Sequence, residues 1–412
     1  MKNISVRILL FLLFAVAMKS LRPKRYLASM QIQSPGLPVR FSSKPTASIS
    51  DVLIQPHLKL PVWPVYGGVL AQLFDWMGIP RAADNILSKI GGRVVPMSLN
   101  ELGLSPFLLL VHHSHSFLPF DPIRPITNLV LPEGFPAHSH SGFGTLTITL
   151  EGGLKHRDSE GVKMTYGNGD AQWMRAGKGV IHEEMWDIPK DKFQKIEIFQ
   201  LWLNIPSTCK YSEPLVDVLK QQEIPEVIID ETGSKARILY GDVNIERMEG
   251  LVIHGPGNRV AESPLCIMHL SLTPGTCQNI VTPPGASCVV YIQKGALTLP
   301  SPRGVDEVSM GNLAIFKRST AESTAIITAG SDGLECLVLI GSPLAERAIM
   351  GGPFVAASEN ELNRIANVWS SIGRAAYWDY LLSDDEWTKH IKSLNLQDKL
   401  KSLTKFDSAF FL

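Results

Sequence analysis

Residues 135–187 read FPAHSHSGFGTLTITLEGGLKHRDSEGVKMTYGNGDAQWMRAGKGVIHEEMWD, and this stretch decides the fold. It contains two pairs of metal-ligand residues, His138 with His140 and His182 with Glu184, each spaced by two positions. Side chains two residues apart on an extended strand point to the same side. Two such pairs on neighbouring strands would therefore converge on one point.

The sequence between the two pairs predicts an antiparallel meander. Residues 145–150 alternate between Thr and Leu or Ile, which is the pattern of a half-buried strand. Glycine-containing turns follow at 152–153, 161 and 167–170, and a further short strand is expected at 171–174. A meander whose first and last strands both carry ligands suits a small closed barrel with a site inside its mouth.

The predicted ligand set is His138, His140, His182 and Glu184. Three imidazoles and one carboxylate favour a divalent transition metal such as iron, nickel, copper or zinc over magnesium or calcium. Four protein ligands leave two positions open on an octahedral ion, where oxygen or a substrate can bind. The alternative is two loop histidines and one hydrogen-bonded core histidine, but the HxE pair after a meander favours the metal site.

At these residues the chain resembles the pirin family, a group of two-barrel cupin proteins. The resemblance rests on HSHSGF at 138–143, HRDSEG at 156–161, GDAQWMRAGKGVIHEE at 169–184 and QLWLN at 200–204. It extends over about residues 91–369. It implies an all-β bicupin fold: two small, jelly-roll-like antiparallel β-barrels with short helices and a helical C-terminal tail.

The resemblance also places the HRDSEG motif outside the metal site. We therefore expect a structural hydrogen-bonding role for His156, although His156 and Asp158 share one face of a strand and His156 is a fifth candidate ligand on geometry alone. Two residues depart from the family pattern, because Ser141 replaces an Arg and Gly144 replaces a Glu. Both changes remove charge beside the predicted metal, where outer groups orient ligands and tune the ion.

Six segments are expected along the chain. They are a targeting presequence at 1–50, an N-terminal extension at 51–90, a metal-binding cupin barrel at 91–212, a connector at 213–252, a cupin barrel without ligands at 253–369, and a helical tail at 370–412. An internal repeat of about 140 residues predicts that the second barrel is a duplicate of the first. In this repeat Val281 and Pro283 replace the first ligand pair, and Thr324 and Ile326 replace the second.

The first 50 residues contain no Asp or Glu but eight Lys or Arg. An apolar run at 8–17 followed by a Ser- and Arg-containing segment indicates a signal peptide and then a transit peptide. This predicts a plastid protein that arrives by the secretory route. A mitochondrial or simple plastid presequence is the first alternative, and secretion is the second.

The five cysteines form no CxxC motif, so a disulfide framework is not indicated. Buried thiols in a reducing compartment fit this pattern better than secretion does. The formal net charge is zero, so nucleic acid is not expected as a direct partner, and the mature chain is not expected to span a membrane. His113 and His115 imitate a ligand pair, but no carboxylate partner follows, and rim or solvated histidines are expected there.

Three functions follow from these observations. The first is an iron-dependent dioxygenase resembling the flavonol-cleaving activity of the family, with one Fe(II) per chain, a small-molecule substrate, and Glu184 as ligand and proton acceptor. The second is a metal-binding regulatory protein whose redox state biases a surface seen by a protein partner. The third is a structural bicupin whose metal stabilises the barrel.

Overall fold

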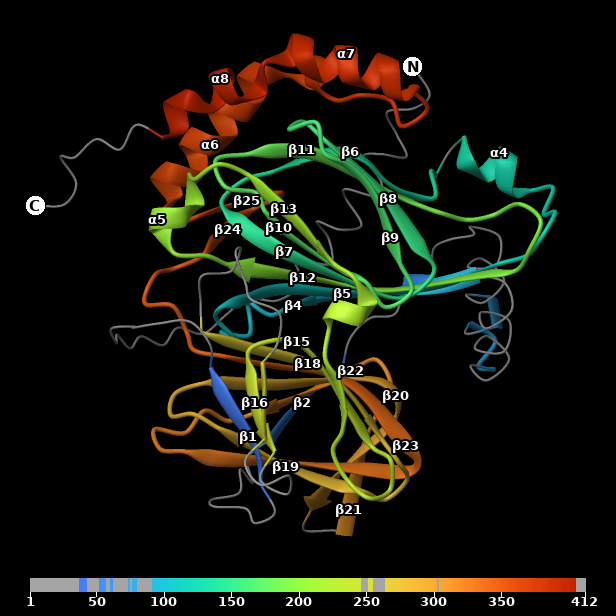
Figure 1. The fold of residues 1–412 in the computed structure, drawn as a ribbon, viewed down its shortest axis with the longest axis vertical. Coiled ribbons are helices and arrows are strands. Elements are labelled where there is room, and N and C mark those ends of the chain that lie inside the picture. The colour runs from blue at the N-terminus through green and yellow to red at the C-terminus, as the bar shows by residue number, and fades with distance from the viewer. Residues whose placement is uncertain are drawn as a thin grey trace, which may run out of the picture.

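The computed structural model describes residues 37–42, 52–56, 60–61, 73–74, 76–79, 91–129, 131–245, 251–254, 264–301 and 304–404. Two β-rich halves are stacked on each other, and a helical tail covers the upper half (Figure 1). Residues 82–90, whose sequence would allow one short helix in the N-terminal extension, lie outside the described residues. No helix in the described ranges is both long and apolar enough to cross a bilayer.

The first half contains two antiparallel sheets that face each other. The seven-stranded sheet has the order β13-β10-β7-β12-β5-β4-β3, and the four-stranded sheet has the order β6-β11-β8-β9. The strands of the larger sheet are β3 (Leu60–Pro61), β4 (Gly91–Ser98), β5 (Phe107–Phe117), β7 (Phe143–Glu151), β10 (Ala171–Arg175), β12 (Gln194–Asn204) and β13 (Leu215–Leu219). Those of the smaller sheet are β6 (Gly134–His140), β8 (Gly153–Asp158), β9 (Lys163–Gly167) and β11 (Val180–Trp186).

The second half is one large branched sheet. Its main path is β14-β15-β18-β23-β19-β1-β16-β17. A branch leaves this path at β23, where β20 pairs with β23 and also with β21 and β22. Strand β22 in turn pairs with β2. Its strands are β1 (Pro38–Ser42), β2 (Val52–Pro56), β14 (Glu226–Ile228), β15 (Lys235–Tyr240), β16 (Asp242–Ile245), β17 (Leu251–His254), β18 (Leu265–Leu272), β19 (Cys277–Thr282), β20 (Ser287–Ser301), β21 (Gly304–Ser309), β22 (Asn312–Phe316) and β23 (Ser323–Gly341).

The strand orders confirm the jelly-roll-like bicupin fold and correct one detail of it. Among the described strands, neither half pairs its first strand with its last, so the sheets are open and not closed barrels. The core of the first half lies between its two sheets, where Phe143 and Trp202 of the larger sheet meet Leu154 and Trp186 of the smaller one. Facing sheets thus enclose the interior without a hydrogen-bonded ring.

Strand β7 differs from the half-buried strand that the alternating pattern of residues 145–150 predicts. The expected half-buried strand is buried on both faces: Leu146 and Ile148 pack against the second half, and the threonines are also buried. The threonine face points into the first half, where Thr147 donates to Glu184 at 3.3 Å. The apolar face of this strand therefore makes the contact between halves, and the polar face lines the site.

Strand β1 lies within the predicted presequence, yet it is part of the second half. It pairs in parallel with β16 and antiparallel with β19, and Leu37, Val39 and Phe41 are buried in the core. The expected boundary at residue 50 therefore lies inside the folded chain; residues 1–36 are outside the described part. Strands of the predicted extension and connector likewise join the two large sheets, as β2, β3 and β13 show.

Four of the five cysteines are buried and Cys277 is exposed, and all five are free thiols. Burial raises the pKa of the Cys288 thiol to about 12, so it behaves as a small apolar core residue. This agrees with the expectation that no disulfide framework holds the chain.

The helices are short until the end of the chain. They are α4 (Arg124–Asn128), α5 (Ser207–Lys210), η1 (Gln221–Glu223), α6 (Glu359–Ile372), η3 (Arg374–Ala376), α7 (Asp384–Leu394), α8 (Leu396–Leu400) and η4 (Lys401–Leu403). The hairpin of β24 (Ile349–Gly351) and β25 (Phe354–Ala356) precedes α6. The helices α6 to α8 pack on the outer side of the four-stranded sheet, around a cluster that includes Ile181, Trp369 and Trp387 (Figure 1).

Candidate metal centre

The two predicted ligand pairs lie on neighbouring antiparallel strands. His182 of β11 is directly opposite His138 of β6, and His140 is two residues further along β6. Side-chain nitrogens of these three histidines lie within 4.8 Å of one another. The ring centroids of His138 and His182 are 4.4 Å apart, and those of His140 and His182 are 5.0 Å apart. The three imidazoles lie together because His138 and His140 share one face of β6 and His182 is paired with His138 across the sheet.

Glu184 belongs to a second, overlapping group. Its carboxylate lies within 4.8 Å of ligand atoms of His156 and His182, whereas His138 and His140 are not members of that group. The structure thus brings three predicted ligands to one point and places the fourth in a neighbouring group that shares His182. Ligation of a metal by these four residues stays a prediction.

His156 is closer to the centre than the family resemblance implied. Strand β8 pairs with β11 so that His156 is opposite Glu184 and Asp158 is opposite His182. Both side chains are fully buried, and Nε2 of His156 lies 3.1 Å from Oδ2 of Asp158. His156 therefore makes a hydrogen bond, as expected. It does not lie outside the candidate site, because it is on the inward face of β8, beside the inward face of β11 that carries His182 and Glu184.

The three clustered histidines are held as neutral imidazoles. Burial lowers the pKa of His138, and it lowers the pKa values of His140 and His182 much further, with the neighbouring histidines adding to the effect. Nδ1 of His138 is 2.9 Å from the carbonyl oxygen of Pro136, which leaves Nε2 for a ligand. Neutral imidazole is the form that binds a metal ion.

His182 carries the clearest sign of a missing partner. It is 1% exposed, and neither ring nitrogen has a hydrogen-bond partner among the described residues. Buried polar nitrogens are nearly always paired, because leaving one unpaired costs about 1–3 kcal/mol. A transition-metal ion fits this position, since one imidazole nitrogen would bind it and the set of neighbouring donors is rich in nitrogen.

Glu184 is fixed by three polar side chains from three other strands. Its Oε1 accepts hydrogen bonds from Tyr166 at 2.9 Å and Thr147 at 3.3 Å, and its Oε2 accepts one from Gln200 at 2.8 Å. The sequence reading missed these partners, although Gln200 stands in the quoted QLWLN segment. They come from β7, β9 and β12, so only the folded arrangement shows that they surround one carboxylate.

Aromatic rings form the wall beside His140. The ring centroids of Phe143 and Trp202 lie 5.0 Å and 5.1 Å from that of His140. His140, His182 and Glu184 are at most 3% exposed, whereas His138 is partly exposed. The centre is therefore an enclosed polar group beside aromatic residues, and it reaches the surface at His138.

The hairpin β24–β25 covers the loop that follows His140. Ser141 bridges to Phe354, and the backbone N–H of Val355 donates to the carbonyl of Ser141 at 2.9 Å. Gly142 has a φ of +84°, and a Cβ there would be 1.9 Å from the carbonyl oxygen of Val355, so only glycine fits. The C-terminal part of the chain thus crosses back and covers the first half.

A buried lysine provides positive charge at the same loop. Lys210 is fully buried, and its Nζ donates to the carbonyl of Gly142 at 2.9 Å and to Oδ1 of Asn204 at 2.5 Å. Burial lowers the pKa of Lys210 to about 8. Most of this ammonium is still charged at pH 7, so the loop near Ser141 has a cation despite the absence of the family Arg.

The histidines of β5 are not solvated, which corrects the sequence-based expectation. His112, His113 and His115 are all at most 6% exposed. His113 and His115 point into the first half beside Trp186, and burial holds the pKa of His113 well below its usual range. Neither histidine is a member of a candidate metal group, which agrees with the prediction that they are not metal ligands.

His112 points the other way, into the contact between the two halves. Its Nδ1 lies 2.8 Å from the hydroxyl of Tyr291, and its Nε2 lies 3.2 Å from Oε1 of Glu197. Gln293 of the second half also donates to Oε1 of Glu197, at 2.7 Å. A buried polar network therefore joins the halves beneath the site.

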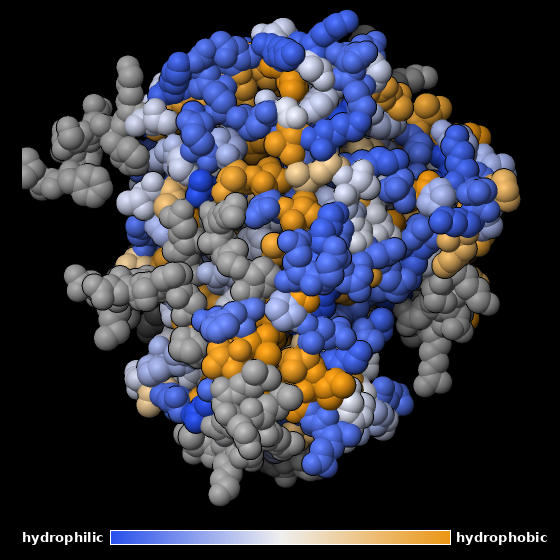
Figure 2. Space-filling view, in the orientation of Figure 1, coloured by the Kyte–Doolittle hydropathy of each residue, from blue (hydrophilic) through white to orange (hydrophobic). Residues whose placement is uncertain are grey.

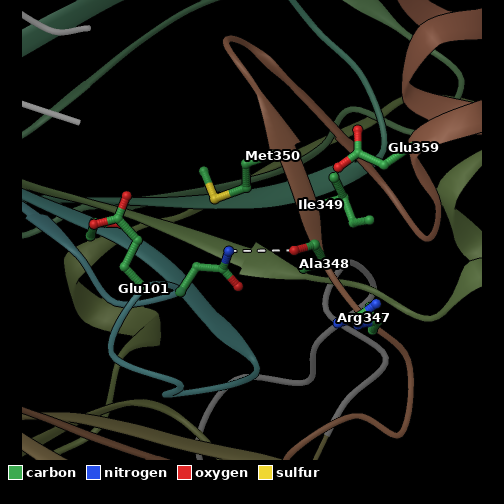
Figure 3. A pocket seen from close by; sticks show the side chains of 8 residues that line it. Glu101, Arg347, Ala348, Ile349, Met350 and Glu359 are labelled. Atoms are coloured by element: carbon green, nitrogen blue, oxygen red, sulfur yellow. Dashed lines mark hydrogen bonds between the residues drawn. The ribbon is translucent and has the colours of Figure 1, made fainter. Parts of the chain in front are cut away.

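Within the described residues, every group of potential metal ligands lies in the first half. The pairs Val281 with Pro283 and Thr324 with Ile326 offer no imidazole or carboxylate at the corresponding positions of the second half. A cavity of about 390 Å³ lies elsewhere, between the turn at Asn100 and the segment 347–350 (Figure 3). Glu101, Arg347 and Glu359 line this cavity without any histidine, so it is not a second metal centre of the predicted kind.

Comparisons with known proteins agree with this geometry. The Pirin family model matches residues 94–203, and the Pirin C-terminal cupin domain matches residues 267–373. The chain belongs to the pirin family. It is 30% identical to Pirin-1 of Arabidopsis thaliana over 260 residues, which is 63% of this chain and 80% of that protein.

Two further relatives show the extent of this pirin fold. The chain is 28% identical to a pirin-like protein of Solanum lycopersicum over 68% of its own length and 81% of the relative. The crystal structure of a quercetin 2,3-dioxygenase from Acinetobacter baumannii superposes with a TM-score of 0.58 at 28% identity. That match covers 69% of this chain and 92% of the bacterial protein, so both cupin halves are shared.

Proposed function

We propose that this pirin binds one divalent transition metal, Fe(II), through His138, His140 and His182, with Glu184 as the fourth ligand, and oxygenates a small enolisable aromatic substrate. The observation that carries the proposal is the convergence of three neutral imidazoles, one of which has two unpaired buried nitrogens. Hydrogen bonds from Tyr166, Thr147 and Gln200 hold the carboxylate of Glu184 beside His182, and this supports Glu184 as the fourth ligand.

The bound metal would supply a Lewis acid that polarises a chelating substrate oxygen and offers open positions for oxygen. The protein's own residues perform the other steps. Glu184 accepts the proton of the substrate hydroxyl, and hydrogen bonds from Tyr166 and Gln200 hold its carboxylate in place. Phe143 and Trp202 contact the aromatic part of the substrate and exclude water from the site.

Support for this substrate class comes from two sides. The named quercetin 2,3-dioxygenase of Acinetobacter baumannii shares both halves of the fold. A flavonol of that kind carries a hydroxyl beside a carbonyl, which can chelate a metal and lose a proton. The wall beside His140 is aromatic, which suits a flat ring better than an aliphatic acid.

A second candidate is a metal-binding regulator that acts through a protein partner. Exposed apolar side chains gather around α4, near the right-hand edge in Figure 2, and they are Leu118, Phe120, Ile123, Ile126 and Leu129. Exposed apolar groups of this kind are typical of contact surfaces. The enclosed metal centre also suits an ion that is retained and not turned over with substrate.

Metal analysis and oxygen uptake separate these two functions. The chain from residue 37 onward, purified without added metal, should contain about one transition-metal ion per chain. The iron-loaded protein should consume oxygen when given a flavonol, and His140→Ala should lose both metal and uptake. Bound iron without uptake above that of free iron would favour the regulator. Two ions per chain would contradict the assignment of a single centre.

We also propose that residues 1–36 direct the protein to a plastid, with the mitochondrion as alternative destination. Their composition supports an organelle signal, and the burial of β1 supports an end of that signal before Leu37. A fluorescent reporter fused behind residues 1–36 should enter plastids. A diffuse cytosolic or nuclear signal would contradict this and favour the regulator.

A further inference from the structure

The residues between the predicted ligands lie on the opposite face of the sheet from the candidate metal centre. Ser139 stands between His138 and His140 on β6, and Glu183 stands between His182 and Glu184 on β11. Strand geometry therefore puts them on the outer face of the four-stranded sheet. Both are nevertheless buried, at 4% and 2% exposed, because the C-terminal helices cover that face. A backbone shift at either residue would also shift the ligands beside it.

The tail binds both of these residues directly. The hydroxyl of Tyr377 is 2.9 Å from Oγ of Ser139. The indole Nε1 of the next residue, Trp378, donates a 2.7 Å hydrogen bond to Oε2 of Glu183. Two consecutive tail residues thus hold the two ligand strands, one each, at the level of the histidines.

Arg157 completes the attachment from the third strand of the sheet. It is opposite Glu183 in the β8–β11 register, and its Nε donates to Oε1 of Glu183 at 2.5 Å. Its other nitrogens donate to the tail carbonyls of Leu382 at 2.9 Å and Tyr380 at 3.2 Å. The buried carboxylate therefore has a charged partner and an indole donor, and the guanidinium is shared between sheet and tail. Breaking one member would leave a buried charge poorly paired.

The tail segment is itself anchored behind these contacts. His390 of α7 lies 3.0 Å from the carbonyl of Ala376, the residue before Tyr377. Gln397 of α8 donates to the carbonyl of Gly179 at 3.2 Å, just before β11 begins. The match to the Pirin C-terminal cupin domain ends at residue 373, so all of these contacts come from chain beyond it.

We infer that Ser139 and Glu183 are positioning residues of the metal centre, and that residues 374–404 act through them to set the spacing of the ligand strands. This inference rests on the proposed metal binding. Since the tail and the metal hold the same two strands, each should stabilise the state that the other prefers. The metal affinity of this pirin is then controlled from the back of the sheet, by a segment that makes no contact with the ion.

Two buried tryptophans of the tail provide a matched test. Trp378→Phe removes the indole N–H that donates to Glu183, whereas Trp387→Phe removes one that has no hydrogen-bond partner among the described residues. The probe is Co(II), whose visible absorption reports ligand geometry, with affinity measured by competition against a chromophoric chelator. Trp378→Phe should weaken Co(II) binding about tenfold and change its spectrum, as loss of an outer partner does. Trp387→Phe should stay within about twofold of the unmodified protein.

Hydrogen exchange on the metal-free protein gives a second readout. Amides of β6 and β11 should exchange faster in Trp378→Phe than in Trp387→Phe, and Tyr377→Phe should show the same effect centred on β6. Added Co(II) should slow exchange in residues 374–394 of the unmodified protein. Equal Co(II) affinities, spectra and exchange rates in the two tryptophan variants would overturn the inference. Failure of the unmodified protein to bind Co(II) would instead overturn the proposed function itself.

Discussion

The hydroxyl of Tyr166 donates a 2.9 Å hydrogen bond to Glu184, the residue predicted to be both a ligand and a proton acceptor. Tyr166 is 1% exposed, and burial together with the charge of Glu184 holds the pKa of its phenol well above its usual range. The phenol therefore stays protonated and always acts as the donor. It fixes which way the carboxylate points before any metal binds.

Tyr166→Phe should weaken metal binding about tenfold, because outer-shell donors orient ligands at a cost of this size when removed. Tyr291→Phe is the matched control, since Tyr291 is equally buried but donates to or accepts from His112 between the halves. The control should lower stability without changing metal affinity. Titration with Co(II) distinguishes them, and equal affinities would show that Glu184 needs no help from Tyr166.

Phe41 tests whether β1 belongs to the folded protein. It is 3% exposed in the core of the second half, so Phe41→Ala should lower the free energy of unfolding by about 3–5 kcal/mol. Arg40→Ala, the neighbouring change, removes a partly exposed ion pair with Glu322 and should cost at most about 1 kcal/mol. Urea denaturation measures both. An unchanged stability for Phe41→Ala would restore the presequence boundary at residue 50.

Local periodicity predicted the inner face of the four-stranded sheet and little of what surrounds it. The alternation that points His182 inward and Glu183 outward depends only on the backbone, so sequence spacing was sufficient. The burial of His113 and of the threonine face of β7 depends on the second sheet of the first half, and the burial of His112 depends on the second half. His112, for example, meets Tyr291 across 179 residues of sequence. No window of neighbouring residues contains that information.

Glu197 should make the stability of this pirin sensitive to acid. Burial raises the pKa of its carboxyl, but hydrogen bonds and charge from His112 and Lys195 outweigh this and hold the pKa well below its usual range. The unfolded chain has a pKa of about 4.3 at such a residue. The stabilising effect is therefore complete above pH about 4.3 and is lost as the pH falls from there towards the folded pKa.

Glu197→Gln should accordingly lower the free energy of unfolding by about 2 kcal/mol at pH 7, and the difference from the unmodified protein should shrink below pH about 4. Glu335→Gln is the control, because its carboxylate pairs with Lys294 at 2.8 Å on the surface. That change should cost less than about 1 kcal/mol at pH 7. Denaturation curves at several pH values test this, and a difference for Glu197→Gln that is constant with pH would contradict it.

Ser141→Arg restores the family residue after the second ligand histidine. If the missing charge is what limits turnover, the sequence alone predicts unchanged metal content and faster turnover. The structure predicts the opposite. Ser141 is fully buried, and its hydroxyl donates to the carbonyl of Lys178 at 2.9 Å beneath the β24–β25 hairpin. A guanidinium there would add a second cation to the buried loop at which Lys210 already donates to Gly142. Since the backbone of Ser141 is bonded to Val355, the larger side chain should also displace the hairpin. Overpacking and an unpaired buried charge should together cost about 3 kcal/mol or more.

Ser141→Ala separates the effect of size and charge from that of the lost hydroxyl, and should cost only about 1 kcal/mol. Thermal unfolding and metal analysis of the two variants make the comparison. Since Ser141 follows His140 directly, displacement of the hairpin by Arg should also reduce the metal content, whereas Ala should retain it. An Arg variant as stable and as metal-loaded as the Ala variant would show that the loop has room for the family side chain.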